Sequence, residues 1–179
     1  LGRLQSILEN SVSQYVFQLT SRPMLLVKDD IYVKKIKRVM VALDKSESAK
    51  QSLKLALSLV KEVSGGEIIL VHVTKDLTGK STEDLTGNAE KDPVLAPAVA
   101  LAKQMGVGYR CVSAAGKPGE AICRIAEEIN ADLLVIGSPD RRPSVAKNFV
   151  DLDRLLGSSL SDYVRVYANC PVLLARTIG

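Results

Sequence analysis

Three continuous apolar runs, each long enough for one strand, constrain the fold of this chain more than any other feature. VMVAL ends at Leu43, EIILVHV covers 67–73, and DLLVIGS covers 132–138. Strands that are buried on both faces show this pattern, and apolar residues recur with helical spacing in much of the sequence between the runs. Alternating strands and helices of this kind predict a parallel sheet with helices on both faces.

The same patterns predict where the individual elements lie. We expect strands at 36–43, 67–73, 109–114, 132–138 and 171–176. Helices should follow Ser46, run from about 93 to 105, begin near Pro118, and precede the last strand. The polar segment 74–92 is predicted to be a surface loop. Aromatic residues make up only 4% of the chain and tryptophan is absent, so Val, Leu, Ile and Ala must build the core.

An internal repeat accounts for the first thirty residues. SQYVFQLTSRPMLLVK at 13–28 is similar to SDYVRVYANCPVLLAR at 161–176, at a constant offset of 148 (173 minus 25). Each copy predicts an amphipathic helix, a turn with proline, and a short apolar strand. We therefore predict that residues 1–30 are the C-terminal helix and strand of a preceding repeat, and that residues 31–179 form one complete domain. The strands near 24–27 and 172–175 should lie side by side, within one chain or between two, because both would otherwise be exposed edges.

Composition argues against several classes of partner. The net charge is +4, and the basic residues are scattered among acidic ones, so we expect no nucleic-acid partner. The sequence has no run of 18 apolar residues and no signal peptide, so we expect no membrane association. Three widely spaced cysteines without a CxxC pair favour neither a metal site nor a disulfide framework. We therefore expect a cytoplasmic location.

Candidate binding residues lie at the predicted strand ends, because ligands of doubly wound sheets bind outside the carboxyl ends of the strands. This rule selects Ala42 to Asp44, Val73, and Gly137 to Asp140. The Asp44 carboxylate either accepts hydrogen bonds from a ribose hydroxyl or an adenine amine, or caps the helix near Ser46. The segment 157–159 either offers N–H groups to phosphate or lets a helix pack closely.

The sequence carries little that predicts catalysis. His72 is the only histidine and lies inside an apolar strand, so we interpret it as a packed residue and not as a base. No phosphate-loop pattern GxxxxGK[ST] and no nucleophile elbow are present. A binding protein is the preferred interpretation, and a slow ATPase is the most that we expect of an enzyme.

Several motifs together resemble the universal stress protein family. They are VMVALDKSESAKQSLKLAL, IILVHV, GKPGEAICRIAEEINADLLVIGS and GSSLSDYVRVYANCPVLLAR, and the resemblance covers residues 36–176. It implies an α/β fold with an open, doubly wound, five-stranded parallel sheet of order 3-2-1-4-5, to which residues 1–30 add a helix and a strand. It also implies a stress-response sensor or regulator that associates through its last strand, as a homo-oligomer or between tandem domains. A regulatory protein partner is a further expectation.

The resemblance also implies a nucleotide site. Ala42 and Asp44 would contact the adenosine and Val73 the base of ATP or AMP, while Gly137 and Ser138 would form the backbone turn. Gly157, Ser158 and Ser159 would contact the phosphates, with Mg²⁺ accompanying ATP. Members that bind ATP carry Gly-x-x-Gly after the fourth strand, and in this chain Asp140 replaces the second glycine.

Asp140 leaves two interpretations open. A carboxylate about 4 Å from a phosphate oxygen costs about 4 kcal/mol at an effective dielectric near 20, which corresponds to roughly 10³ in affinity. Arg141, Arg142 and Lys147 would offset this repulsion if the loop folded them over the phosphates. Otherwise the chain is a dimerisation or partner-interaction module with a degenerate phosphate loop.

Overall fold

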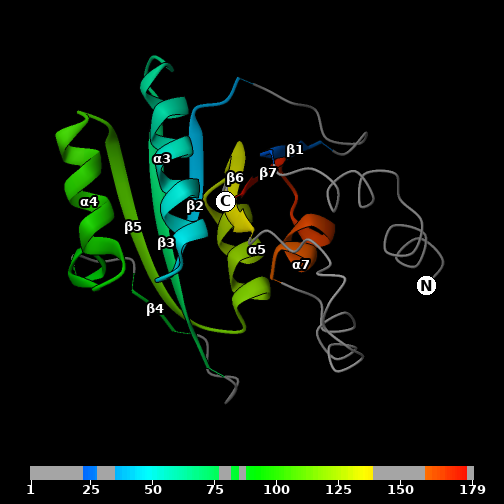
Figure 1. Ribbon diagram of the computed structural model, residues 1–179. Coiled ribbons are helices and arrows are strands. Elements are labelled where there is room, and N and C mark those ends of the chain that lie inside the picture. Colours follow the sequence, from blue (N-terminus) through cyan, green and yellow to red (C-terminus); the bar gives the residue numbers. More distant parts are fainter. Residues whose placement is uncertain (1–21, 28–34, 77–81, 85–87, 139–159, 177–179) are drawn as a thin grey trace, which may run out of the picture.

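One twisted sheet with helices on both faces forms the molecule (Figure 1). The computed structural model describes residues 22–27, 35–76, 82–84, 88–138 and 160–176. Its strands are β1 (Met24–Leu26), β2 (Arg38–Leu43), β3 (Glu67–Lys75), β4 (Thr82–Asp84), β5 (Gly108–Gly116), β6 (Leu133–Ser138) and β7 (Val172–Arg176). Its helices are α3 (Glu47–Lys61), α4 (Leu95–Gln104), α5 (Pro118–Glu128) and α7 (Leu160–Tyr167), with a 3₁₀ turn η1 (Ala89–Lys91).

The number of strands corrects the expected five-stranded sheet. The described sheet has seven strands in the order β1-β7-β6-β2-β3-β5-β4, two more than expected, and its interior, read from β5 to β7, has the predicted order 3-2-1-4-5. The five predicted strands occupy its interior, and β1 and β4 extend its two edges. The interior pairs are all parallel, whereas β1 pairs antiparallel with β7 and β4 antiparallel with β5. β1 is the short apolar strand that the repeat predicted, whereas β4 has the sequence TED and is too short and too polar to be distinguished by sequence pattern.

Alternate residues along the buried strands point to two separate cores. On β3, Ile68 and Leu70 pack with α3 and α4, whereas Ile69 and Val71 pack with α5 and α7. All four side chains are fully buried. This division follows from the twofold period of a strand, and it explains why the central strands are apolar without interruption. The prediction of a parallel sheet covered on both faces is confirmed.

The helix starts follow the predicted signals. Ser46 is the N-cap of α3, and its Oγ accepts a hydrogen bond from the Ala49 N–H at 3.1 Å. Pro118 occupies the first helical position of α5, where its missing N–H costs nothing. Both helices present their apolar stripe to the sheet, so sequence pattern and packing agree.

The segment 74–92 differs from the predicted loop. It contains β4, which pairs with β5 from Thr82↔Ala115 to Asp84↔Ser113, and then η1. At the other edge, Leu25 of β1 pairs with Leu173 of β7, so the predicted neighbourhood of these two strands is confirmed. The helix predicted within residues 1–21 lies outside the described residues.

Candidate functional site

A hollow lies at the carboxyl ends of β2, β3 and β6, where the chain connections leave β2 in opposite directions. Its described walls enclose about 120 Å³. The residues that line it include four of the predicted site residues, namely Ala42, Asp44, Val73 and Gly137. The other lining residues are Leu43, Ser46, Ser48, Ala49, Val71, Pro118, Ile122, Ile136 and Leu160. The structure thus brings together strand ends that are about 30 to 90 residues apart in the sequence.

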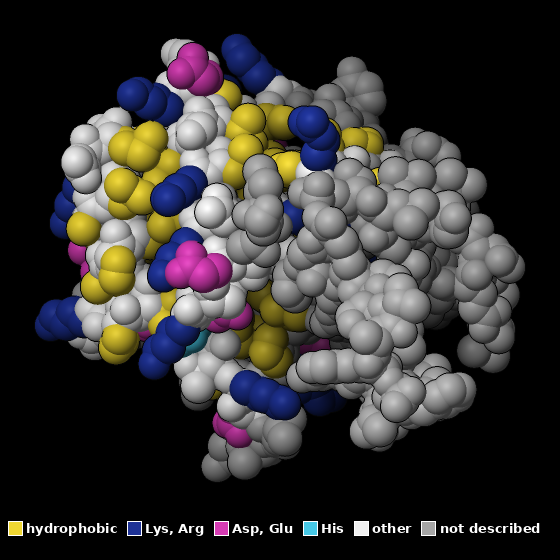
Figure 2. All heavy atoms as spheres, in the orientation of Figure 1, with side chains coloured by type: hydrophobic (Ala, Val, Ile, Leu, Met, Phe, Trp, Pro, Cys, Tyr) yellow, Lys and Arg dark blue, Asp and Glu magenta, His cyan; other side chains and the backbone are white. Residues whose placement is uncertain are grey.

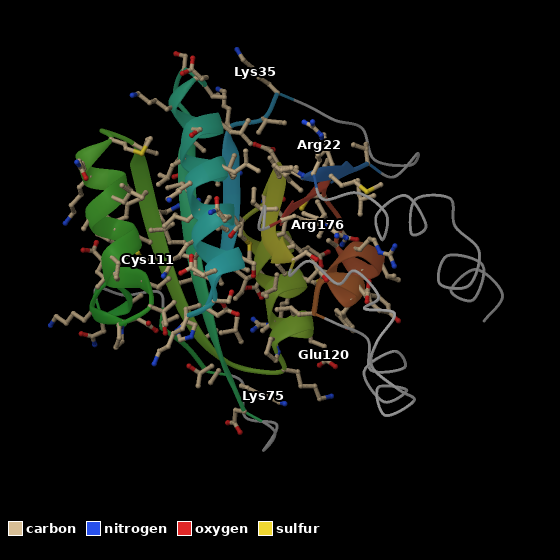
Figure 3. The ribbon with its side chains drawn as sticks, viewed as in Figure 1. Arg22, Lys35, Lys75, Cys111, Glu120 and Arg176 are labelled. Atoms are coloured by element: carbon tan, nitrogen blue, oxygen red, sulfur yellow. The ribbon has the colours of Figure 1, made fainter. Side chains whose placement is uncertain are left out.

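The remaining predicted site residues are placed differently. Ser138 is buried at the end of β6, with 3% exposure, and it is not among the described lining residues. It pairs with Arg176 of β7, which Figure 3 labels. Asp140, Gly157, Ser158 and Ser159 lie outside the described residues, as do Arg141, Arg142 and Lys147. The described part of the hollow is therefore the end where the resemblance puts the base and the ribose.

Asp44 is not the N-cap of α3, but its carboxylate contacts the backbone just before this helix. Its Oδ1 accepts a hydrogen bond from the Ser46 N–H at 2.8 Å, so the carboxylate braces the turn before α3. The cap itself is Ser46. Within the described residues, the second carboxylate oxygen of Asp44 accepts no hydrogen bond, and the side chain lines the hollow. Asp44 thus stabilises the local turn while its side chain lines the hollow.

Gly137 is required by packing between a strand and a helix. A β-carbon at this position would lie 2.5 Å from the carbonyl carbon of Ser48 and 2.8 Å from the Ala49 nitrogen. Both atoms belong to the backbone of α3, which cannot move aside as a side chain would. The sequence predicted this glycine as part of a ligand turn. In the structure its absent side chain allows the first turn of α3 to approach β6 and close one wall of the hollow.

Two serines line the site that the sequence had not suggested as binding residues. Ser46 is the N-cap of α3 and Ser48 lies in its first turn, with their Oγ atoms 3.0 Å apart. Ser48 is buried, at 7% exposure. The pattern Asp-x-Ser-x-Ser immediately after an apolar strand was the available signal, but a capping function explained it equally well. Together with Asp44 these hydroxyls give the hollow one polar wall.

The opposite wall is apolar. Val71 and Val73 of β3 face Ile122 of α5 and Ile136 of β6 around the hollow. Ligand pockets commonly combine an apolar lining with a few convergent polar groups. An apolar wall beside a carboxylate and two hydroxyls suits a flat aromatic ring attached to a sugar.

His72 lies on the other face of β3 and takes no part in this hollow. Its Nδ1 is 2.7 Å from Oδ2 of Asp92, and Ser113 Oγ donates to the same carboxylate oxygen at 3.0 Å. Because Ser113 donates to Asp92 and not to His72, the trio does not form a Ser–His–Asp nucleophile system. Sequence reasoning did not identify Asp92, which precedes α4 and accepts a hydrogen bond from the Val94 N–H at 2.8 Å.

The electrostatics of this cluster are those of a structural anchor. Burial acts to raise the pKa of Asp92, but hydrogen bonds from His72, the Val94 N–H and Ser113 outweigh it and hold the pKa below its usual value. Nearby Cys111 of β5 packs against the core beside α4 (Figure 3), and burial raises the pKa of its thiol to about 11. A protonated thiol is a poor nucleophile, so Cys111 offers no activated group beside the cluster.

Other functional classes find little support in the described part of the chain. Its residues contain no group of three His, Cys, Asp or Glu side chains that could hold a metal ion. None of its helices is long and apolar enough to cross a membrane. Figure 2 shows lysine and arginine side chains dispersed among acidic ones on the face in view, with no continuous basic stripe.

The sheet order at its centre, the hollow at the strand ends and the capped α3 define an open, doubly wound α/β domain. Residues 35–176 match the model of the universal stress protein family, and the chain belongs to this family. The tandem arrangement inferred from the repeat is not part of that match, which covers a single domain.

Particular relatives agree with this assignment. A universal stress protein of Synechocystis sp. is 29% identical over 103 residues, which are 56% of this chain and 66% of that protein. The crystal structure of a universal stress protein from Archaeoglobus fulgidus is 28% identical, with a TM-score of 0.71. That match covers 97% of this chain but only 56% of the archaeal chain, so this chain spans little more than half of its length.

A third structure resembles this chain in fold. It is a universal stress protein family protein from Arabidopsis thaliana with AMP bound, at 21% identity and a TM-score of 0.56. The match covers 80% of this chain and 93% of that chain. A likeness at this identity establishes the common fold, and the AMP belongs to the plant protein.

Proposed function

We propose that this chain is a stress-response regulator that binds an adenine nucleotide, AMP or ATP, in the hollow at the ends of β2, β3 and β6. The observation that carries the proposal is the pairing of one apolar wall with one polar wall at this edge of the sheet. AMP in the plant relative supports the choice of ligand.

Each wall has a function in this proposal. Val73 would pack against the base, because a planar ring that covers an apolar side chain removes its surface from water. The open oxygen of Asp44 would accept a hydrogen bond from a ribose hydroxyl, and Ser48 lies beside it as a further hydrogen-bonding group. The phosphates would extend toward residues 157–159, with Mg²⁺ bound alongside ATP.

Regulation by binding is favoured over fast catalysis. Asp44 is the only ionisable side chain among the residues described as lining the hollow. Acid–base catalysis usually needs a second group that gives or takes a proton at the reacting atom. A slow ATPase is therefore the most active enzyme compatible with this wall.

An interaction module without nucleotide is the second candidate. Asp140 favours it, since a carboxylate in the phosphate loop opposes phosphate binding. In that case the altered loop would contact a regulatory protein, and the hollow would stay without a nucleotide.

Isothermal titration calorimetry with AMP and with ATP, each with and without Mg²⁺, separates the two candidates. The nucleotide proposal predicts saturable binding that Ser48→Ala weakens by about tenfold, the equivalent of one lost hydrogen bond. Ser58→Ala on the exposed side of the same helix is the matched control, because its hydroxyl only bonds to the Lys54 carbonyl. No heat and no thermal shift at millimolar nucleotide would refute the proposal.

Two further features complete the proposal. A tandem arrangement, with a second universal stress protein domain ahead of residue 31, is supported by the repeat at an offset of 148 (173 minus 25). A cytoplasmic location is supported by the odd number and wide spacing of the three cysteines, Cys111, Cys123 and Cys170, which favour no disulfide framework.

A further inference from the structure

The side chain of Tyr163 in α7 lies against Gly119 in the first turn of α5. A β-carbon added at Gly119 would lie 2.7 Å from Cδ1, 2.9 Å from Cγ and 3.3 Å from Cβ of Tyr163. These distances leave no space for a side chain at position 119, because Cβ and Cγ of the tyrosine are held close to the backbone of α7. The two helices therefore meet through a glycine and an aromatic ring, and Figure 1 shows α7 beside α5.

Local backbone preference does not explain this glycine. Gly119 has no positive φ, so alanine could adopt the same backbone conformation. Alanine is also more favourable than glycine within a helix. The close approach of Tyr163 is thus the feature of the structure that excludes a side chain at this position.

Both partners of this contact are close neighbours of residues that line the hollow. Pro118 directly precedes Gly119 and Ile122 follows it by one helical turn, and both are lining residues. Leu160, one turn before Tyr163 and therefore on the same side of α7, lines the hollow as well. The contact between Gly119 and Tyr163 thus fixes how closely Leu160 approaches Pro118 and Ile122.

A second tyrosine packs against the ring of Tyr163. The ring centroids of Tyr163 and Tyr167 are 4.4 Å apart, with their planes tilted by 33°. Tyr167 is 47% exposed, whereas Tyr163 is partly buried. Such an aromatic pair is favourable and restricts rotation of the inner ring, so Tyr163 is held against α5.

We propose that Tyr163 is a positioning residue of the nucleotide site: its ring, packed on Gly119, holds the start of α7 at the separation from α5 that the ligand needs. The inference rests on the proposed nucleotide function and adds a determinant of affinity that does not itself touch the ligand. A small displacement of a supporting element is enough to weaken binding at a site whose groups must be correctly placed.

The phosphate end of the ligand should depend most on this contact. In the proposed function the phosphates extend toward residues 157–159, which directly precede α7. The base and the ribose instead meet residues of β2, β3 and α3, which do not move with α7. AMP should therefore lose more affinity than adenosine when α7 is displaced from α5.

A double-mutant cycle in ligand affinity tests this role. Isothermal titration with AMP and with adenosine compares the wild type, Gly119→Ala, Tyr163→Ala and the double variant, with Gly108→Ala as the matched glycine control. Gly119→Ala should weaken AMP binding by about tenfold in the wild-type background and by much less in the Tyr163→Ala background, because the ring that the new methyl group meets is then absent. Tyr163→Phe, which keeps the ring, should retain the affinity that Tyr163→Ala loses.

Circular dichroism at the titration temperature separates positioning from folding. Unchanged helix content together with a loss that is larger for AMP than for adenosine supports the inference. If Gly119→Ala does not fold, the comparison of Tyr163→Ala with Tyr163→Phe carries the test.

Two results overturn the positioning role and leave the proposed function standing. One is wild-type AMP affinity in both Gly119→Ala and Tyr163→Ala. The other is a loss that is equal for AMP and adenosine, or that follows the loss of folded protein, because the contact is then only structural. A wild type that binds neither ligand refutes the proposed function, and the positioning role with it.

Discussion

The Nδ1 of His72 lies 2.7 Å from the Oδ2 of Asp92, and this contact attaches the segment before α4 to the end of β3. Both side chains are largely buried, at 19% and 11% exposure. Asp92 also accepts hydrogen bonds from Ser113 and from the Val94 N–H, so one carboxylate links β3, β5 and the start of α4. The cluster lies on the face opposite the candidate nucleotide site.

Replacing His72 with Leu should lower the free energy of unfolding by about 1–3 kcal/mol, because Asp92 then loses a hydrogen bond in a largely buried place. Urea denaturation followed by circular dichroism measures the change. Ser113→Ala, which removes a second donor to the same carboxylate, should cost less, about 0.5–1.5 kcal/mol. An unchanged unfolding midpoint for His72→Leu would show that the contact does not hold α4 in place.

Stability should fall in acid through Asp92. Its pKa is lowered in the folded state, so the carboxylate binds a proton less readily when folded than when unfolded. Its contribution is present above the unfolded pKa, near 3.8, and is lost as the pH falls through the lower folded pKa. Asp92→Asn should therefore flatten the loss of stability below about pH 5. A variant whose pH profile parallels that of the wild type would contradict this origin.

Gly137→Ala should destabilise the domain by about 1–3 kcal/mol, because the new methyl group would overlap the backbone of Ser48 and Ala49. Gly108→Ala is the matched control, since the nearest atom to its added β-carbon, the Gly66 carbonyl oxygen, is 3.8 Å away. Thermal unfolding compares the two variants. Equal melting temperatures would mean that α3 moves away from β6 at little cost.

Asp44→Asn should separate the two roles of this side chain. The amide oxygen can still accept the Ser46 N–H, so the melting temperature should stay nearly unchanged. Loss of the negative charge should weaken AMP binding by about tenfold if the carboxylate meets a ribose hydroxyl. Glu47→Gln is the control in calorimetry, because Glu47 is exposed and follows Asp44 by only three residues. Equal affinity for wild type and Asp44→Asn would remove Asp44 from the ligand contacts.

Sequence alone predicted the elements whose signals are local. Uninterrupted apolar runs located β2, β3 and β6, and Ser46 and Pro118 marked the starts of α3 and α5. The repeat predicted that β1 and β7 are neighbours, which the pairing of Leu25 with Leu173 confirms. These predictions succeed because backbone periodicity, capping and an uncovered edge are properties of short segments.

The tertiary structure alone decided which distant residues meet. β4 needs the edge of β5 to form, and the three polar residues of its own sequence carry no strand period. Gly137 is necessary because a β-carbon there would lie 2.5 Å from the carbonyl carbon of Ser48, a residue far earlier in the chain. Asp92 matters because the side chains of His72 and Ser113 both contact its carboxylate. Such contacts depend on strand order and on how closely helices pack on the sheet, and neither quantity is written in any one segment of the chain.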